Sequence, residues 1–539
     1  MSVFAGAEDP IHGAKTPAVR AETPAVPSRR SRPRLAASAL ALTAAVGLGV
    51  TVGCGSTGPG TARAQARAAK VPTGAAQIVV GRPQSVHPIQ AGFLGLSLEF
   101  NAIEPYAGTD PRAVNPVLVQ LIRNLANGQR PVIRIGGDTT DRTWWPVTGM
   151  ARPGGVRITL NNQWLGVTRA LAQSLDARLT LGVNLETDSR AIAQAEAHAF
   201  VSGIGARYVD ALEPGNEPEL YPSFTWYVAP DGAHVKGRPP SYTIATFTRD
   251  FANIERGLPG PIAGPSIGGP GWRRQLGTFL RGPARLNVVT LHRYPLQLCF
   301  VNPQKPTYPT IPHLLSPPAT SGLAQSIASQ VRMAHAHGLP VRIDEMNTIS
   351  CGYVPKVGNS FATALWAVDA LFAMAHVGVD GVNMHSFPGS TCALFSFRRV
   401  KGSWQGKVEP EYYGLMLFAQ AAPPGSRLLH VSGPGTTVVR TWATRGVDGL
   451  TRVMLINEHS GRSERVALPA SELGSGAASV ERLEAPSLGA QRGIKLGGAS
   501  FGTATTTGQL RPTATSVTPT QGYYVIDVAP GSAALVTGS

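Results

Sequence analysis

The chain has 539 residues, of which 15% are charged and 43% hydrophobic, and its formal net charge at pH 7 is +16. The length exceeds one ordinary domain, and the hydrophobic fraction excludes a disordered chain. The positive charge favours anionic partners such as acidic glycans, but no basic run with interleaved aromatic residues is present, so we expect no nucleic acid partner.

The N-terminal segment, residues 1–54, has the pattern of an export signal. A basic stretch that ends at Arg34 precedes a hydrophobic run that begins at Leu35. This order is typical of export, and we expect the protein to be secreted or held in the cell envelope. The residues before Cys54 resemble a bacterial lipobox, so lipidation of this cysteine is a second hypothesis. Residues 55–75 are rich in Gly, Ala, Thr and Pro and predict a flexible linker.

Residues 76–422 alternate short hydrophobic runs with helical stretches. The runs, which predict strands, are 93–100, 132–135, 179–185, 208–212, 262–267, 288–292, 341–345 and 379–385. Helices are predicted over 115–126, 163–175, 189–204, 242–258, 272–280, 321–337, 359–376 and 411–421. Several runs are hydrophobic throughout, as parallel strands covered on both faces are. Eight such units predict an α/β fold, a (β/α)8 TIM barrel, with functional residues at the carboxyl ends of its strands.

The pattern changes after Ala422, where two prolines and a glycine interrupt the chain. Short runs typical of strands follow, separated by Gly, Ser and Thr, at 437–444, 452–457, 465–468, 478–483, 521–529 and 532–537. They predict a C-terminal antiparallel β-sandwich over residues 423–539. A strand near 76–82 precedes the barrel and could join this sandwich.

Two glutamates stand where predicted strands end. Glu217, in the segment Gly-Asn-Glu-Pro, follows the fourth run, and Glu345 ends the seventh. In a parallel barrel both carboxyl groups would lie over the same end. Cleavage of a glycosidic bond needs such a pair, one to attack the anomeric carbon and one to protonate the leaving oxygen. A polar turn would also explain Gly-Asn-Glu-Pro, but it does not explain the second glutamate.

Further polar side chains follow the predicted strands and are candidates for binding a sugar. The candidates are Asn216, Glu99, Asp138, Asp141, Asn184, Tyr294, His292 and His385. For each of them a structural hydrogen bond is an equally good interpretation. Trp144, Trp145 and Trp226 could stack on sugar rings or simply pack in loops. Arg134 could bind a catalytic carboxylate or act as a structural partner of one.

Six segments carry a resemblance to a known family: 212–221, which contains Gly-Asn-Glu-Pro, then Ile-Gly-Gly-Asp at 135–138, 345–352, 361–369, 381–385 and 412–418. They resemble retaining glycoside hydrolases of clan A and, more closely, glycoside hydrolase family 79, the β-glucuronidase and heparanase-like family. The resemblance implies that Glu217 is the acid/base and Glu345 the nucleophile. It also implies that a uronate carboxylate binds near the loop after the nucleophile. The candidates there are Cys351, Gly352 and Tyr353, with Tyr294 opposite.

The sequence therefore predicts a retaining, exo-acting β-glycosidase, most readily a β-glucuronidase that cleaves β-linked glucuronic acid from glycans or glycosides. The mechanism would be double displacement, without a metal or organic cofactor. One alternative is a clan A glycosidase for a neutral sugar, such as an arabinofuranosidase, xylosidase or glucosidase. Another is a non-catalytic cell-surface glycan-binding protein. A transglycosylase would need the same two carboxylates.

The four cysteines are too few for a disulfide framework in a chain of this length. No CxxC or HExxH pattern is present, so we predict no zinc site. Cys351 and Cys392 follow the seventh and eighth predicted strands. We predict a disulfide between these two at the rim of the site.

Overall fold

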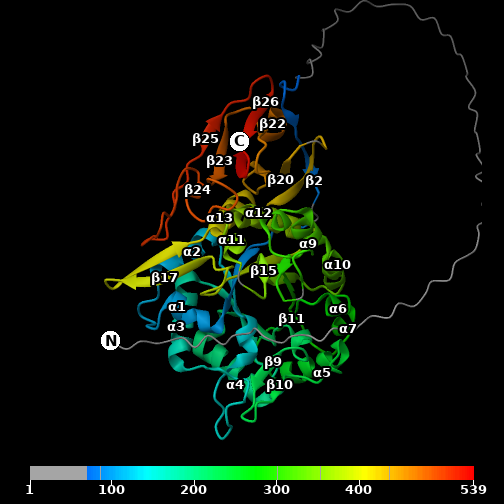
Figure 1. Ribbon diagram of the computed structural model, residues 1–539, viewed down its shortest axis with the longest axis vertical. Helices are drawn as coiled ribbons and strands as arrows, with labels where there is room; N and C mark the ends of the chain where they lie inside the picture. The colour runs from blue at the N-terminus through cyan, green and yellow to red at the C-terminus, as the bar shows by residue number, and fades with distance from the viewer. Residues whose placement is uncertain (1–69, 85–86, 300, 353, 436, 539) are drawn as a thin grey trace, which may run out of the picture. The chain divides into compact units, whose positions relative to one another are not determined.

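The computed structural model describes residues 70–84, 87–299, 301–352, 354–435 and 437–538, and Figure 1 colours these by residue number. The predicted export segment, the possible lipidation site at Cys54 and most of the predicted linker lie outside the described residues. Among the residues that are described, we find no helix whose length and hydropathy would allow it to cross a membrane.

Eight parallel strands form one sheet in the order β11-β12-β14-β16-β3-β4-β7-β8. They are β3 (Leu94–Glu99), β4 (Val132–Gly136), β7 (Arg178–Val183), β8 (Val209–Pro214), β11 (Ala263–Ile267), β12 (Val288–Arg293), β14 (Val341–Met346) and β16 (Gly381–His385). A parallel bridge between Leu212 and Ile262 joins the two edge strands. The backbone N–H of Leu212 also donates to the carbonyl of Pro261 at 2.8 Å. The sheet thus closes on itself, and the predicted barrel is confirmed.

Helices lie between these strands along the chain. They are α2 (Pro116–Ala126), α3 (Asn162–Leu175), α4 (Arg190–Phe200), α5 (Ile244–Glu255), α6 (Pro270–Arg273), α7 (Leu276–Leu280), α9 (Ser321–Gln325), α10 (Ala328–Ala336), α12 (Phe361–His376) and α13 (Pro410–Ala421). Side-chain caps set several starts: the side chain of Asn115 accepts from two N–H groups of α2, and Ser189 and Thr243 cap α4 and α5.

Three predicted α-helices are interrupted within their predicted ranges. The one over 189–204 ends at Phe200 and continues as the π-helical turn η3 (Val201–Gly205). The one over 272–280 is two short helices, and the one over 321–337 is divided at Ser326. Ser326 donates to the carbonyl of Leu323 at 2.6 Å and accepts from Arg293 at 3.0 Å, so side-chain bonds hold the turn there. Such bonds compete with the helix, and the hydrophobic periodicity does not show them.

Shorter elements occupy the loops. They are η1 (Phe100–Ala102), α1 (Ile103–Ala107), η2 (Gly137–Arg142), β5 (Thr143–Trp144), β6 (Ile158–Thr159), η4 (Pro218–Leu220), β9 (Thr225–Val228), β10 (His234–Lys236), β13 (Leu296–Gln297), α8 (Ile311–Leu314), η5 (Pro317–Ala319), β15 (Ile349–Ser350), α11 (Pro355–Gly358), β17 (Phe395–Val400) and β18 (Ser403–Val408). The hairpins β9–β10 and β17–β18 lie in loops that follow barrel strands, and the hydrophobic pattern of the sequence does not predict them.

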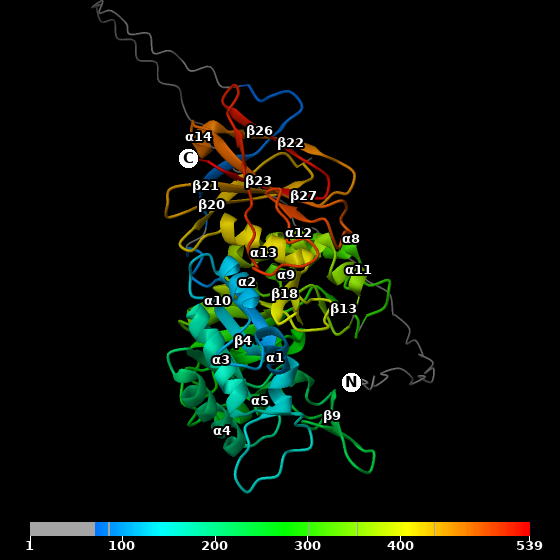
Figure 2. The same ribbon diagram turned by 90° about the vertical axis from the view of Figure 1, so that its left-hand side faces the viewer.

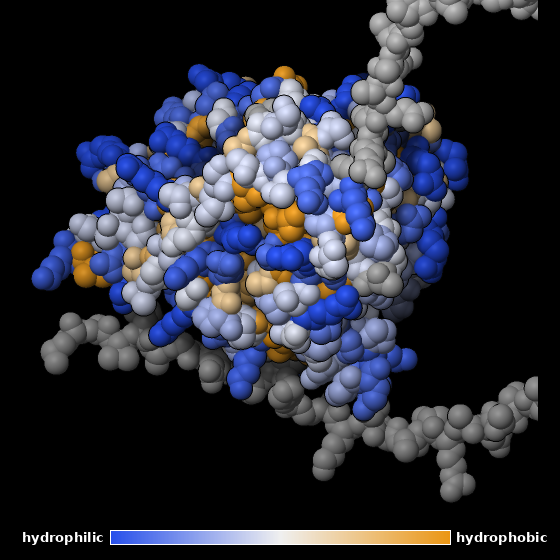
Figure 3. All heavy atoms as spheres, turned by 90° about the horizontal axis from the view of Figure 1, so that it is seen from above, coloured by the Kyte–Doolittle hydropathy of each residue, from blue (hydrophilic) through white to orange (hydrophobic). Residues whose placement is uncertain are grey.

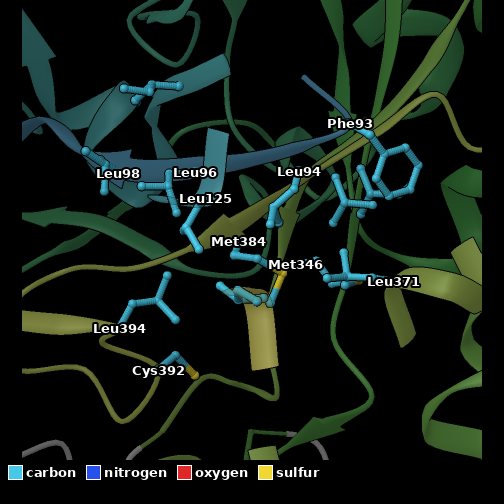
Figure 4. Close-up of a cluster of buried hydrophobic side chains, with 14 of the residues drawn as sticks. Phe93, Leu94, Leu96, Leu98, Leu125, Met346, Leu371, Met384, Cys392 and Leu394 are labelled. Atoms are coloured by element: carbon cyan, nitrogen blue, oxygen red, sulfur yellow. The ribbon is translucent and has the colours of Figure 1, made fainter. Parts of the chain in front are cut away.

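The barrel core consists of hydrophobic side chains between strands and helices. Leu94, Leu96 and Leu98 alternate along β3 and lie together with Met346 and Met384 of neighbouring strands, as Figure 4 shows. This alternation sends the intervening residues of β3 to the other face, as the two-residue period of a strand requires. Those intervening positions include Ser97 and Glu99, which are buried polar residues.

The C-terminal β domain contains two sheets, ordered β2-β19-β20-β21-β27-β23-β24, with β25 on β23, and β1-β22-β26. Its elements are β1 (Ala76–Gln77), β2 (Val79–Pro83), β19 (Arg427–Ser432), β20 (Val439–Arg445), β21 (Thr451–Asn457), β22 (Glu464–Pro469), α14 (Ala470–Leu473), β23 (Ala478–Glu484), β24 (Lys495–Leu496), β25 (Thr515–Val517), β26 (Tyr523–Val528) and β27 (Ser532–Thr537). β1 pairs with β22 and β2 with β19, so the chain enters the barrel from this domain.

The helices α12 and α13 lie between the barrel and the β domain (Figures 1 and 2). α12 is buried without interruption from Phe361 to Met374, as expected of a helix covered on all sides. Phe372 stacks on Trp442 of β20 at 5.7 Å between ring centroids. The two modules therefore share a hydrophobic contact.

The surface at the β-domain end shows small hydrophobic patches among hydrophilic side chains (Figure 3).

Candidate active site

The two glutamates lie at the carboxyl ends of barrel strands. Glu345 is the penultimate residue of β14. Glu217 follows β8, after Gly215 in a positive-φ turn, and itself has φ 45° in the left-handed region. A non-glycine residue there costs backbone energy, so its surroundings must hold it. The backbone N–H of Glu217 donates to the carbonyl of Ser266 at the end of β11, at 2.9 Å.

Asp141 supports the loop that carries Glu217. Its carboxylate accepts from the backbone N–H of Asn216 at 2.9 Å and from the Tyr221 hydroxyl at 2.6 Å. It also accepts from the backbone N–H groups of Leu185 and Glu186, at 2.8 and 3.0 Å. With four protein donors, this carboxylate has little capacity left for a sugar hydroxyl. The structure therefore places Asp141 behind the loop, as a support, and not among groups that face a substrate.

Arg134 of β4 is the centre of a buried network. Its guanidinium donates to Glu213 at 2.6 Å, to Glu345 at 2.8 Å and to the side-chain oxygen of Asn216 at 2.9 Å. Asp344 lies 3.1 Å from the same Nε. One side chain thus contacts the carboxylate of Glu345 and the residue just before Glu217. This fixes the two strand ends relative to each other.

The pKa values of two carboxyl groups of this network, Asp344 and Glu213, are shifted in opposite directions. Burial raises the pKa of Asp344, and the charge of Glu213 raises it further. Burial also acts to raise the pKa of Glu213, but Arg134 outweighs it and the net pKa is lowered. Asp344 therefore remains protonated beside an ionised Glu213, which limits the negative charge around Arg134.

Glu345 is held in the ionised form. Its Oε1 accepts from the Tyr294 hydroxyl at 2.7 Å and its Oε2 from Arg134. Burial acts to raise the pKa of Glu345, but the charges of His385, His292 and Arg134 and the tyrosine bond outweigh it, and the net pKa is lowered. A carboxylate that stays ionised is suited to nucleophilic attack.

His292 of β12 lies between the two glutamates. Its Nδ1 is 3.0 Å from Oε1 of Glu217 and 3.8 Å from Oε2 of Glu345. Burial acts to lower the pKa of His292, but Glu345, Asp344 and the bond to Glu217 raise it to about 10. Because both oxygens lie so close to one nitrogen, the separation of the two carboxyl groups can match the retaining value of about 5–5.5 Å. It reaches only the lower end of the range for inversion, about 6.5–9.5 Å.

Glu99, Asp138 and His385 form a second polar group beside the first. Glu99 accepts from the backbone N–H groups of Asp138 and Thr139, at 3.1 and 2.9 Å, and lies 3.4 Å from Nε2 of His385. Asp138 is exposed to solvent, and Asn216 donates to it at 3.4 Å. Desolvation by surrounding protein atoms and the charges of Glu99, Glu345 and Glu217 raise the pKa of Asp138 to about 7. Of these groups, Asp138 is the one open to a ligand.

Other sequence candidates have structural roles or lie at the edge. Asn184 is fully buried and bonds to loop backbone. Trp144 is buried, and the indole N–H of Trp226 donates to the carbonyl of Asp141 at 3.0 Å. Trp145 packs against the hydrophobic core, half-buried. Gly352 is exposed after β15 and faces Leu298, while Tyr353 lies outside the described residues.

The predicted disulfide between Cys351 and Cys392 is wrong. Cys351 is bonded to Cys299, in the loop after β12, and Cys392 is a buried free thiol. The parallel pair β13–β15 brings the loops after β12 and β14 side by side, which places Cys299 next to Cys351. Cys392 instead lies 3.5 Å from the hydroxyl of Thr348. The disulfide therefore connects the loops that follow Tyr294 and Glu345.

Sequence reasoning missed four residues that hold the site: Ser97, Glu213, Ser266 and Asp344. Ser266 accepts from Arg134 at 3.1 Å and is 3.0 Å from Nε2 of His292. Ser97 is 3.3 Å from Arg134 and 3.2 Å from His385. A signal was present in the sequence, because Asp344 is an acidic residue inside a strand-like hydrophobic run and Glu213 directly follows one, where a buried charge needs a partner.

The chain is similar to known glycoside hydrolases. The family model described as the Glycosyl hydrolase family 79 C-terminal beta domain matches residues 441–535. A beta-glucuronidase of Neurospora crassa is 24% identical over 449 residues, which cover 73% of this chain and 77% of that protein.

Solved structures share the fold. A 4-O-α-L-rhamnosyl-β-D-glucuronidase from Fusarium oxysporum 12S, in complex with Rha-GlcA, has a TM-score of 0.66 at 19% identity. The alignment covers 86% of this chain and 100% of that one. A family 51 α-L-arabinofuranosidase from Bifidobacterium longum has a TM-score of 0.60 at 12% identity, over 87% of this chain and 100% of that one.

Proposed function

We propose that the chain is a member of glycoside hydrolase family 79 and acts as a retaining β-glucuronidase that removes terminal β-linked glucuronic acid from glycans or glycosides. The observation that carries this proposal is the placement of Glu217 and Glu345 on either side of His292, with Glu345 ionised. The substrate class is supported by the similarity to the beta-glucuronidase of Neurospora crassa and to the rhamnosyl-glucuronidase of Fusarium oxysporum.

In the first step an oxygen of Glu345 attacks the anomeric carbon while Glu217 gives its proton to the glycosidic oxygen. The bond between that carbon and oxygen breaks, the aglycone leaves as an alcohol, and an ester joins the sugar to Glu345. Arg134 and Tyr294 hold the attacking carboxylate through one oxygen each. Their bonds orient it toward the sugar before the reaction begins.

In the second step Glu217, now ionised, takes a proton from water, and the water oxygen attacks the anomeric carbon. The ester bond breaks and the Glu345 carboxylate is restored. Its low pKa makes it a good leaving group at this point. The sugar leaves with its original β configuration, because two inversions have occurred at the same carbon.

The sugar hydroxyls require partners at the same end of the barrel. Asp138 is exposed there and lies beside the amide of Asn216. We assign these two side chains to the hydroxyls of the sugar that is cleaved. An acidic substrate also fits the net charge of +16, which raises the encounter rate with anions. We also propose that the protein is secreted or anchored in the cell envelope.

The test is hydrolysis of 4-nitrophenyl β-D-glucuronide by the full chain, with Glu345→Gln as the inactive variant and Glu104→Gln, an exposed glutamate of α1, as the matched control. We expect activity in the parent and the control and none in Glu345→Gln. Proton NMR in deuterated water should show the β anomer first.

A release of the α anomer first would overturn the retaining mechanism. Activity on neutral aryl glycosides alone would reassign the substrate to an arabinoside, xyloside or glucoside. Tight binding of oligosaccharides in titration calorimetry, with no product from any glycoside, would identify a binding protein.

A further inference from the structure

Glu219, two residues after Glu217, holds a turn that follows β11. Its Oε1 accepts from the backbone N–H of Gly268 at 2.7 Å and from the backbone N–H of Gly269. The mechanism above does not use this carboxyl group. Its other oxygen is buried and has no hydrogen-bond partner among the described residues.

Arg273 holds the same turn from the opposite side. Its Nε donates to the carbonyl of Gly268 at 2.8 Å. Arg273 is the last residue of α6, and its side chain is buried. The two peptide groups of Gly268 are therefore fixed on both sides, the N–H by Glu219 and the carbonyl by Arg273. A backbone held in this way has little freedom to move.

Gly268 packs directly on the carboxyl group of Glu217. A Cβ atom at this position would lie 2.6 Å from Oε1 of Glu217 and 3.4 Å from Cβ of His292, so only glycine fits without displacement. The same Oε1 is hydrogen-bonded to His292 at 3.0 Å. The carboxyl group of Glu217 thus rests between an imidazole and a stretch of backbone that Glu219 keeps in place.

Glu219 and Glu217 also interact electrostatically. Burial, and then the charge of Glu217, raise the pKa of Glu219 to about 7. The two carboxyl groups are therefore close enough for an electrostatic interaction. The other titratable groups around the pair are His292, Glu345, Asp138, Tyr294 and Arg273.

We propose that Glu219 is a positioning residue for the general acid: it clamps the Gly268–Gly269 turn against Glu217 and so fixes the point from which the proton is delivered. This inference rests on the proposed function of Glu217. The two catalytic carboxylates are thus held by different residues: Arg134 and Tyr294 orient the nucleophile, whereas Glu219 positions the acid.

The test compares substrates that differ in their need for acid. A phenyl leaving group requires protonation, whereas 2,4-dinitrophenolate leaves without it. We measure kcat/KM, which reports the first step, for phenyl and 2,4-dinitrophenyl β-D-glucuronides. The variants are Glu219→Ala and Glu219→Gln. Glu255→Ala is the matched control, because that carboxylate also holds a backbone N–H, at Arg285, and is not part of the site.

For Glu219→Ala we expect a loss of about 10- to 100-fold on the phenyl substrate and less than about threefold on the dinitrophenyl substrate, within the range that general acid catalysis contributes. Glu219→Gln retains an oxygen acceptor for the turn and should recover most of the phenyl activity. The control should match the parent on both substrates.

Equal losses on both substrates, in a variant that melts at the parent temperature, would overturn the proposal and assign Glu219 to binding or folding. No loss on either would also overturn it. If the parent cleaves neither glucuronide, the glucuronidase activity itself fails. The same two leaving groups on the neutral sugar that is cleaved then test Glu219, and a parent inactive on every glycoside overturns both.

Discussion

The barrel end and the interface with the β domain each contain an arginine among carboxylates. At the barrel end, Arg134 contacts Glu213, Asp344 and Glu345, and it is fully buried. At the interface, Arg440 of β20 contacts Glu458 at 2.6 Å and Asp369 of α12 at 3.5 Å. The chemistry of the two networks is the same, but their positions in the fold differ.

The difference lies in what else reaches the carboxylates. Asp369 accepts from the indole N–H of Trp442 at 2.7 Å. The two residues lie on α12 and β20, which pack on each other where the barrel meets the β domain. Glu345 instead lies at an open strand end beside Glu217 and the exposed Asp138. A buried arginine with carboxylates is therefore no sign of a catalytic site by itself. What distinguishes the catalytic network from the one at the interface is that one of its carboxylates lies at an open strand end, next to a second acid.

The largest expected effect is on the catalytic side of this comparison. Glu345→Gln should lower kcat/KM by about 10⁴- to 10⁶-fold, as removal of a nucleophile does. The amide is nearly isosteric, so the melting temperature should remain close to that of the parent. Aryl-glycoside kinetics and thermal unfolding measure the two quantities. A residual activity within tenfold of the parent would show that Glu345 is not the nucleophile.

Arg134→Lys should damage both activity and stability. A lysine can replace the charge but cannot reach Glu213, Asn216 and Glu345 together, because it lacks the planar fork of donors. We expect kcat/KM to fall roughly 10³-fold, the scale of losing a preorganised donor, and the free energy of unfolding to fall by about 3–5 kcal/mol. Urea unfolding and kinetics on the same preparation check this. Full activity would mean that Arg134 only stabilises the fold.

Arg440→Met is the matching change at the interface. It leaves Asp369 and Glu458 without their cation, and the free energy of unfolding should fall by about 1–3 kcal/mol, less than for a fully buried pair. The reduction is smaller because the Arg440 side chain is 28% exposed. The value of kcat/KM should stay within about twofold, since surface or interface changes remote from a site leave it intact. A loss of activity without a loss of stability would contradict the separation of the two networks.

The smallest expected effect is a pH dependence of stability caused by His292. Its pKa is about 10 in the folded protein, against about 6.5 when unfolded. The protonated form therefore stabilises the fold fully below pH ~6.5, and this contribution is lost as pH rises toward 10. Between these values the free energy of unfolding should fall by at least about 1 kcal/mol more in the parent than in His292→Gln. Urea unfolding of both proteins at pH 6, 8 and 9.5 tests this prediction. An equal decrease of the unfolding free energy with pH in the two proteins would contradict it.

The sequence was sufficient for the barrel and for the place of the two glutamates. The eight predicted strands all occur, since continuous hydrophobic runs specify buried parallel strands whatever their neighbours are. The helix divided at Ser326 and the hairpins β9–β10 and β17–β18 could not be predicted. Their causes are a bond to Arg293 from another element and packing of loops, neither of which leaves a local pattern.

The supports of the site depended on contacts between distant residues. Asp141 ranked among the sugar ligands by its place after a strand, yet its carboxylate holds backbone from two other loops. The disulfide partner of Cys351 could not be chosen by counting strands, because the short pair β13–β15 determines which loops meet.

By itself the sequence determined a barrel with a glutamate at the ends of two of its strands, because hydrophobic period and strand order fix which residues reach that end. The tertiary structure alone decided how each carboxyl group behaves. Glu345 is ionised because Arg134, His292 and His385 converge on it from three other strands. Glu217 rests on Gly268 because Glu219 holds a turn from another part of the barrel. Such distances between strands set charge and protonation, and no local pattern of residues encodes them.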